Sequence, residues 1–300
     1  MTKNGKSVDE REELNMSTLG LSKSRLERMH QVLLGYVERN EMPGFVALVS
    51  HHDDVHVEAV GTLAFDNLAP MSRDTIFRIA SITKPITAVA AMILVEECKL
   101  RLDDSIEPWL PELANRRVLK SISSDLDDTV PALRAITVRD LLTYRMGFGS
   151  VMAMPNTFGS LPWLAQPGEW WMYQVSGDVL GVLIARVSGQ SLGTFMRERI
   201  FEPLRMKDTA FHVPAEKIDR LPGFYFFDHQ TNTLNVFDDL MNSAWGAEPP
   251  FESGGGGLVS TIDDYFAFSR MMLNKGRHGR ERILSRASVE LMTSDQLTPE

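Results

Sequence analysis

The chain has 300 residues, of which 43% are hydrophobic, so it can bury a sizeable core in one large domain or two lobes. Its formal net charge of −9 argues against nucleic acid or an anionic membrane surface as a main partner. Cys98 is the only cysteine, which excludes an internal disulfide and fits a reducing compartment. Because it follows a long apolar segment, Cys98 is expected to be a buried thiol.

The N-terminal part of the chain predicts a loose arm, a helix and a hairpin. Residues 1–20 are polar and contain no apolar run that could serve as a secretory leader, and no stretch is long enough to span a bilayer. The expected location is therefore the cytoplasm. Ser22 can cap a helix that runs to Asn40, and Phe45–Ser50 and Val55–Val60 predict two antiparallel strands. The histidines near their turn are interpreted as solvated, so no metal site is predicted.

Next comes a long apolar segment, Ala88–Val95, which is typical of a helix through a domain centre. Further helices are predicted at Thr137–Leu142, with a capping box closed by Asp140, at Asp178–Val187, at Leu192–Phe201 and at Asp263–Met271. A hairpin is predicted at Leu221–Asp239. Gly147–Gly149 is expected to end the first of these helices. The Ser253–Leu258 glycine run lacks a phosphate-loop lysine and is interpreted as a tight turn. Asp178 and Arg186 are expected only to cap and solvate their helix.

Ser81 and Lys84 stand just before the apolar segment, in Phe77–Ile86. The spacing predicts that Ser81 lies in the first turn of a buried helix with Lys84 one turn further on, since residues three apart on a helix are neighbours. A lysine at that range can help a serine hydroxyl to lose its proton. The helix N-terminus would add a partial positive charge useful to an oxyanion. By itself, a Ser-x-x-Lys pattern equally fits surface capping.

Five stretches in order resemble the serine β-lactamase and penicillin-binding-protein superfamily: Phe77–Ile86, Ile136–Thr143, Pro167–Tyr173, Phe201–Thr209 and Gly254–Thr261. Their order and spacing are similar to the class C branch and closest to the family VIII carboxylesterases, from about Leu21 to the end of the chain. The resemblance implies an α+β fold of the β-lactamase/transpeptidase type, with an antiparallel sheet flanked by helices and a mostly helical lobe. The expected lobes are 21–70 with 212–300, and 71–211.

The resemblance also implies a mechanism. Ser81 would be the nucleophile that forms an acyl-enzyme, and Lys84 would keep its hydroxyl ready to lose the proton. Tyr173 would act as general base and later as general acid, which requires a nearby ammonium to lower its pKa. The Ser81 amide would be one oxyanion donor. Without Ser81 and Lys84, Tyr173 would be interpreted as a core aromatic residue.

Two departures from the family pattern qualify the expected activity. The second motif is Tyr-x-Asn in β-lactamases and peptidases, but here Val175 takes the place of the asparagine and offers no amide hydrogen bond. Small esters therefore fit better than β-lactams. The third motif, Lys/His/Trp-x-Gly, would follow Glu300, together with the last strands and the C-terminal helix. The chain is accordingly expected to be a fragment of a longer protein, and the Phe45–Val60 hairpin to present an open apolar edge.

These observations predict a serine hydrolase of short-chain esters that needs no metal or cofactor and binds neither nucleic acid nor membrane. Alternatives are a β-lactamase or D-Ala-D-Ala carboxypeptidase, a hydrolase of short amide oligomers, and a catalytically silent binding protein on the same fold. The expected substrate pocket is lined by the Met152–Trp163 loop, Trp170 or Trp171, Val175 and Tyr225. These aromatic residues equally fit a lobe interface. The sequence does not predict an oligomeric state.

Overall fold

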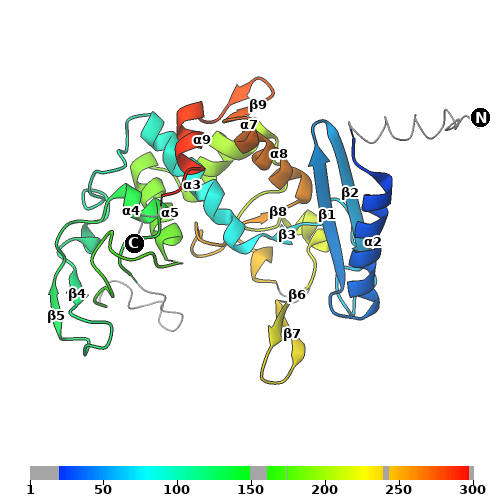
Figure 1. Ribbon diagram of the computed structural model, residues 1–300, viewed down its shortest axis with the longest axis horizontal. Coiled ribbons are helices and arrows are strands. Elements are labelled where there is room, and N and C mark those ends of the chain that lie inside the picture. The colour runs from blue at the N-terminus through cyan, green and yellow to red at the C-terminus, as the bar shows by residue number, and fades with distance from the viewer. Residues whose placement is uncertain (1–19, 149–160, 174, 239–242, 297–300) are drawn as a thin grey trace, which may run out of the picture. The chain divides into compact units, whose positions relative to one another are not determined.

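A computed structural model describes residues 20–148, 161–173, 175–238 and 243–296 (Figure 1). The chain forms two compact units. The first unit comprises Met1–Phe77, Ala215–Ser243 and Thr261–Asp263, and the second comprises Arg78–Pro214, Ala244–Ser260 and Asp264–Glu300. The lobe boundaries expected from the sequence remain a prediction. The loose arm falls outside the described residues, apart from Gly20.

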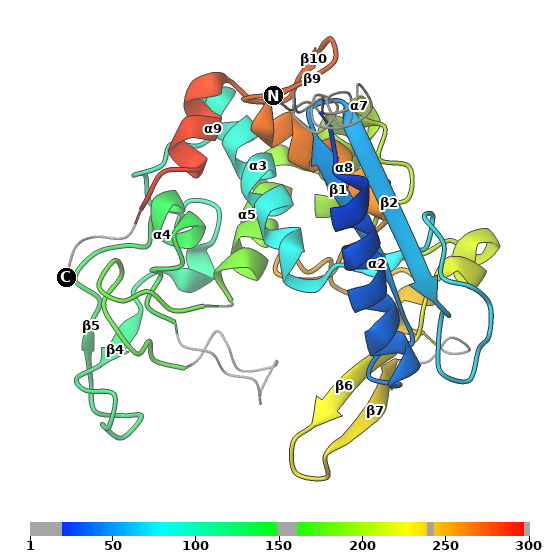
Figure 2. The same ribbon diagram turned by 45° about the vertical axis from the view of Figure 1, so that its right-hand side comes forward.

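The first unit begins with helix α2 (Lys23–Glu38), followed by strands β1 (Gly44–His51) and β2 (Asp54–Gly61). Both strands are where the sequence predicts them, and they pair in antiparallel register from Gly44–Gly61 to His51–Asp54. In both views α2 lies alongside this hairpin (Figure 1, Figure 2). Ser22 occupies the N-cap position, but its side chain caps no amide, so the predicted capping role is wrong.

A second hairpin in the first unit consists of β6 (Phe224–Asp228) and β7 (Thr233–Asp238), as predicted. A register shift separates Phe224 from Tyr225. Successive residues of a strand point to opposite faces, so both faces of this hairpin expose large apolar side chains: Phe226, Phe227, Leu234, Val236 and Phe237. The strand pairing is therefore clear, while much of the apolar surface of this hairpin is uncovered by the described residues.

The second unit is mainly helical. Its helices are α3 (Thr83–Glu96), α4 (Val138–Leu142), α5 (Ser176–Ser188), α6 (Leu192–Met196), α7 (Glu202–Leu204), α8 (Ile262–Leu273, from Asp264 onward) and α9 (Arg286–Met292). Short strands are β3 (Phe77–Arg78, at the unit boundary), β4 (Arg117–Leu119), β5 (Thr129–Pro131), β8 (Val259–Ser260), β9 (Arg277–His278) and β10 (Glu281–Arg282). β4 pairs with β5 and β9 with β10, each antiparallel.

The core of the second unit is built on α3, which packs against α5. Side chains on nearly every side of α3 are buried, from Thr83 and Ile86 to Leu94, as expected for a helix with no polar face. Pro85 is tolerated because the amides of a first helical turn have no intrahelical partner. A helix that is packed on nearly all sides gives rigid support to the residues at its N-terminal end.

Two helices differ in detail from the prediction. The segment Leu192–Leu204 is not one regular helix, because a π-helical turn at Arg197–Phe201 separates α6 from α7. At α4, Thr137 and Asp140 form the predicted capping box. This helix ends at Leu142, with Thr143 as its C-cap, before Gly147, so the predicted C-terminus is wrong.

Cys98 is exposed, contrary to the expectation of a buried thiol. α3 ends at Glu96. Cys98 has a φ of 58°, a left-handed conformation that changes the direction of the chain before Leu100. The apolar helix therefore ends two residues before the cysteine. Among the described residues no single helix is long and apolar enough to cross a bilayer; α5 and Leu192–Leu204, bent by 78°, reach that length and composition only together.

Candidate active site

Ser81 lies in a sharp turn at the N-terminal end of α3. The turn is a 3₁₀ helix, Ala80–Ile82, so Ser81 precedes the α-helix rather than lying in its first turn, which corrects the predicted placement. Ala80 has a φ of 44°, a left-handed conformation that is costly for a residue with a side chain. The Ile79 amide donates to the Leu258 carbonyl at 3.0 Å and anchors the turn. Ser81 itself is exposed, as a nucleophile must be to meet a substrate.

Lys84 lies in the first turn of α3, half-buried, with its ammonium directed at Ser81. Its Nζ donates to the Ser81 Oγ at 2.8 Å and to the Gly255 carbonyl oxygen at 2.5 Å. The Nζ also lies 4.7 Å from the ring centroid of Tyr173. The structure therefore brings together Ser81, Lys84 and Tyr173, as the sequence predicts.

Tyr173 presents its ring to the same place. Hydrogen bonding of its hydroxyl to Ser81 and to Lys84 lowers the pKa of Tyr173 below its ordinary value, against a smaller opposing effect of burial. Its ring stacks on Tyr144, with centroids 5.7 Å apart, and on Trp171, at 6.0 Å. With 38% of its surface exposed, Tyr173 combines ring contacts that fix its orientation with an accessible hydroxyl.

The turn segment Pro167–Tyr173 is held by backbone hydrogen bonds to the chain that follows α4. The Met172 amide donates to the Tyr144 carbonyl at 2.8 Å, and the Gly168 amide donates to the Arg145 carbonyl at 2.7 Å. Tyr144 is itself a left-handed residue, with φ of 59°. Burial first, then the neighbouring Tyr173 and Asp178, raise the pKa of the Tyr144 hydroxyl, so Tyr144 is a neutral partner in the stack.

The glycine run turns between α3 and α5, and this contact is not predicted from the sequence. Thr87 Oγ1 donates to the Gly254 carbonyl at 2.7 Å, and Thr83 Oγ1 accepts from the Leu258 amide at 3.3 Å. From α5, Asp178 Oδ1 accepts from Ser253 Oγ at 2.6 Å and from the Gly255 amide at 3.0 Å. The role expected for Asp178 was only capping and solvation, and the structure corrects it.

Glycine is required at position 254 because the backbone of the turn lies against α5 there. A Cβ on Gly254 would lie 2.5 Å from the Gly177 carbonyl oxygen, closer than real Cβ atoms approach. Gly181 on α5 also faces Gly254: a Cβ added to Gly181 would lie 3.4 Å from the Gly254 Cα. The tight-turn interpretation is therefore confirmed, and the close approach is what brings the Gly255 carbonyl within reach of Lys84.

The other predicted pocket residues are placed less uniformly. Trp170 is exposed, Trp171 stacks on Tyr173, and Val175 is half-buried at the start of α5, against the core. Tyr225 belongs to the first unit, where its hydroxyl accepts from the Phe65 amide, so its part in substrate binding remains a prediction. Most of the predicted Met152–Trp163 loop lies outside the described residues; Trp163 is fully buried.

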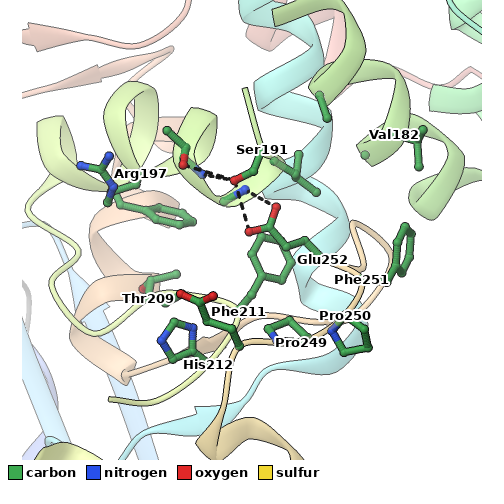
Figure 3. Close-up of a pocket in the computed structure, with 18 of the residues that line it drawn as sticks. Val182, Ser191, Arg197, Thr209, Phe211, His212, Pro249, Pro250, Phe251 and Glu252 are labelled. Atoms are coloured by element: carbon green, nitrogen blue, oxygen red, sulfur yellow. Dashed lines mark hydrogen bonds between the residues drawn. The ribbon is translucent and has the colours of Figure 1, made fainter. Parts of the chain in front are cut away.

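A cavity of about 830 Å³ lies elsewhere in the second unit, and none of the predicted catalytic residues lines it. Its walls come from α5, α6 and Glu248–Glu252 (Figure 3). Figure 3 shows the Glu252 carboxylate directed at Ser191 and at the adjacent backbone. Glu252 Oε2 accepts from the Gly193 amide at 2.8 Å, which tethers the residue immediately before Ser253.

Across the described ranges, no three histidine, cysteine or acidic residues are grouped as metal ligands would be.

The family model described as Beta-lactamase matches residues 29–300. The chain belongs to the β-lactamase family. Membership of the serine β-lactamase and penicillin-binding-protein superfamily, and its α+β fold of helices with small antiparallel sheets, are thus confirmed.

Three similar proteins are informative. Protein Rv1367c of Mycobacterium tuberculosis is 40% identical over 86% of this chain and 69% of its own length. Lovastatin esterase of Penicillium rubens is 33% identical over 82% of this chain and 66% of its own length. The unliganded structure of simvastatin synthase (LovD) from Aspergillus terreus has a TM-score of 0.79 at 23% identity, over 93% of this chain and 74% of that one. The chain thus spans about two-thirds of the length of the curated relatives.

Proposed function

We propose that this β-lactamase-family chain is a serine hydrolase that forms an acyl-enzyme on Ser81 and acts on short-chain carboxylic esters. The observation that carries the proposal is the Lys84 ammonium, 2.8 Å from the Ser81 Oγ and 4.7 Å from the Tyr173 ring. An esterase among the relatives at 33% identity supports the reaction class. Val175, which has no amide to orient a β-lactam side chain, favours esters.

The proposed reaction follows from these contacts. Tyr173, whose pKa is lowered, accepts the Ser81 hydroxyl proton as the Oγ bonds to the ester carbonyl carbon. The tetrahedral oxyanion then collapses, the C–O bond to the alcohol breaks, and the Tyr173 proton passes to the leaving oxygen. Water attacks the acyl-serine, Tyr173 takes its proton, and the acid leaves while Ser81 regains a hydrogen. Lys84, which donates to the Ser81 Oγ and lies beside the Tyr173 ring, stabilises the tyrosinate and the developing charge.

The test is hydrolysis of p-nitrophenyl butyrate and of nitrocefin by the wild type and by Ser81→Ala, on the protein at its natural length. We expect a burst of p-nitrophenol equal to the enzyme concentration and a butyryl adduct on the Ser81 peptide by mass spectrometry, both absent from Ser81→Ala. Activity that survives this substitution would refute the nucleophile. Rapid nitrocefin turnover would favour a β-lactamase or peptidase. The absence of a butyryl adduct from the wild type would favour a binding protein.

A further inference from the structure

A half-buried chain of hydrogen bonds connects Asp178 on α5 to the predicted nucleophile through the glycine turn. Asp178 Oδ1 accepts two hydrogen bonds from the turn, from Ser253 Oγ at 2.6 Å and from the Gly255 amide at 3.0 Å. The carbonyl of the same Gly255 accepts from Lys84 Nζ at 2.5 Å. The link therefore runs from a carboxylate through one glycine residue to the ammonium that donates to Ser81.

We propose that Asp178 is a positioning residue of the acyl-serine reaction, which fixes Gly255 so that its carbonyl oxygen holds the Lys84 ammonium between Ser81 and Tyr173. This inference rests on the function proposed above. An ammonium has three hydrogens, and two are directed by Gly255 and Ser81. Without a fixed Gly255 carbonyl the long lysine side chain would sample other rotamers, at the cost of alignment with Ser81.

The surroundings of Asp178 agree with a positioning role. The titratable groups that face it are Lys84 from α3, through Gly255, and Tyr144 after α4, whose hydroxyl feels the Asp178 charge. Tyr144 in turn stacks on Tyr173. Asp178 thus bonds directly to the glycine turn and acts on Tyr144 through its charge, while its own hydrogen bonds do not reach the Ser81 Oγ.

Glu252 supplies a matched control, because it also tethers the glycine turn by a carboxylate that accepts a backbone amide. It bonds to Gly193 at 2.8 Å and to Ser191 at 3.4 Å, both on the α6 side (Figure 3). It makes no contact with Gly255. If the turn only needs to be attached, Glu252→Gln and Asp178→Asn should have equal effects.

The experiment measures the rate at which a fluorophosphonate labels Ser81 between about pH 6 and about pH 10. A tyrosine whose pKa is lowered titrates within this range. In this reaction the Ser81 Oγ bonds to phosphorus, fluoride leaves, and the hydroxyl proton passes to Tyr173. We expect Asp178→Asn to slow labelling about tenfold and to move its half-maximal pH upward, since a displaced Lys84 no longer favours the tyrosinate. Glu252→Gln should change the rate less than about twofold and leave the midpoint in place.

Gly255→Ala provides a second, independent variant. A Cβ there would lie 3.0 Å from Asp178 Oδ1, so the turn and the carboxylate must separate by a few tenths of an ångström. Because the backbone of Gly255 does not have a positive φ, alanine is tolerated, and this variant decides the matter even if Asp178→Asn does not fold. It should show the same slower rate and higher midpoint.

The outcomes separate this inference from the function beneath it. A wild type that takes no label at Ser81 refutes the proposed function. A labelled wild type with Asp178→Asn and Gly255→Ala indistinguishable from it refutes only the positioning role. Equal losses in Asp178→Asn and Glu252→Gln, with no change in either midpoint, would also overturn it, since any tether would then suffice.

Discussion

The two units of the chain bury their apolar residues to very different extents. The main hydrophobic core, with α3 and α5 at its centre, lies within the second unit. In the first unit α2 has no buried residue, and the β6–β7 hairpin exposes Phe226, Phe227 and Phe237. The residues proposed to react, Ser81, Lys84 and Tyr173, all belong to the well-packed unit.

This difference teaches where precision is needed. Catalytic groups must keep their geometry within fractions of an ångström, which requires neighbours locked by packing. Substitutions in the second unit that disturb the packing around Ser81, Lys84 and Tyr173 should therefore change activity, whereas comparable substitutions in the first unit should change local stability. A first-unit substitution that removes activity would break the comparison.

The largest expected effect is that of Lys84→Ala. Removal of the ammonium takes away the donor to Ser81 and the charge beside Tyr173, so kcat/KM for p-nitrophenyl butyrate should fall about 10³- to 10⁴-fold. Lys99→Ala is the matched control, because Lys99 is half exposed and pairs with Glu97 at the surface. Equal losses in both variants would contradict the assignment of Lys84.

Tyr173→Phe should lower kcat about 10²-fold while the ring stack on Tyr144 is retained. Because the pKa of Tyr173 is lowered, the rising limb of the wild-type pH–rate profile should lie below the value of about 10 for a free tyrosine. The base form exists above this pKa, so activity rises with pH, and the variant should lack that limb. Tyr36→Phe, in the first unit, should leave the profile unchanged.

Asp140→Asn should reduce the free energy of unfolding by about 2 kcal/mol. Burial would raise the pKa of Asp140, but hydrogen bonds from Arg134 and Thr137 outweigh it and hold the pKa below its usual range. This stabilisation is complete above the unfolded pKa, about 4, and is lost as the pH falls through the folded value. Urea unfolding at several pH values measures it. The exposed Asp103–Arg139 pair gives the control, and Asp103→Asn should have a smaller effect.

The smallest effect should follow from Glu58→Gln in the first unit. Hydrogen bonds from His56 and His30 lower the pKa of Glu58, so its contribution is present above the unfolded pKa and lost toward acid pH. Loss of the charge should cost about 1 kcal/mol, visible as weaker hydrogen-exchange protection of β1 and β2. Hydrolysis of p-nitrophenyl butyrate should not change. A tenfold loss of activity would contradict the independence of the two units.

Local patterns predicted the elements well. The two apolar strands within Phe45–Val60 and the apolar run at Ala88–Val95 are strong hydrophobic signals, and Thr137 with Asp140 is a complete capping box. The Ser81, Lys84 and Tyr173 cluster followed from motif order in the family, since Tyr173 is too far along the chain for spacing to place it.

What the sequence did not predict depends on tertiary approach. Nothing local to Asp178 indicates that it accepts from Gly255, because the partner is 77 residues away. A run of four glycines predicts a turn but not the helix it lies against. Cys98 was misplaced for a different reason: α3 ends at Glu96, and Cys98 is a left-handed residue in the turn after the helix, so it lies outside the buried segment.

The exposed Cys98 has a practical consequence. As the only thiol in the sequence, it accepts a single maleimide dye without any prior substitution. α3 separates it from Ser81, and its 14 residues at a rise of 1.5 Å each place the dye roughly 20 Å from the nucleophile. That separation suits resonance energy transfer to a fluorescent phosphonate on Ser81. The transfer would report the distance between the two ends of α3 without any substitution in the protein.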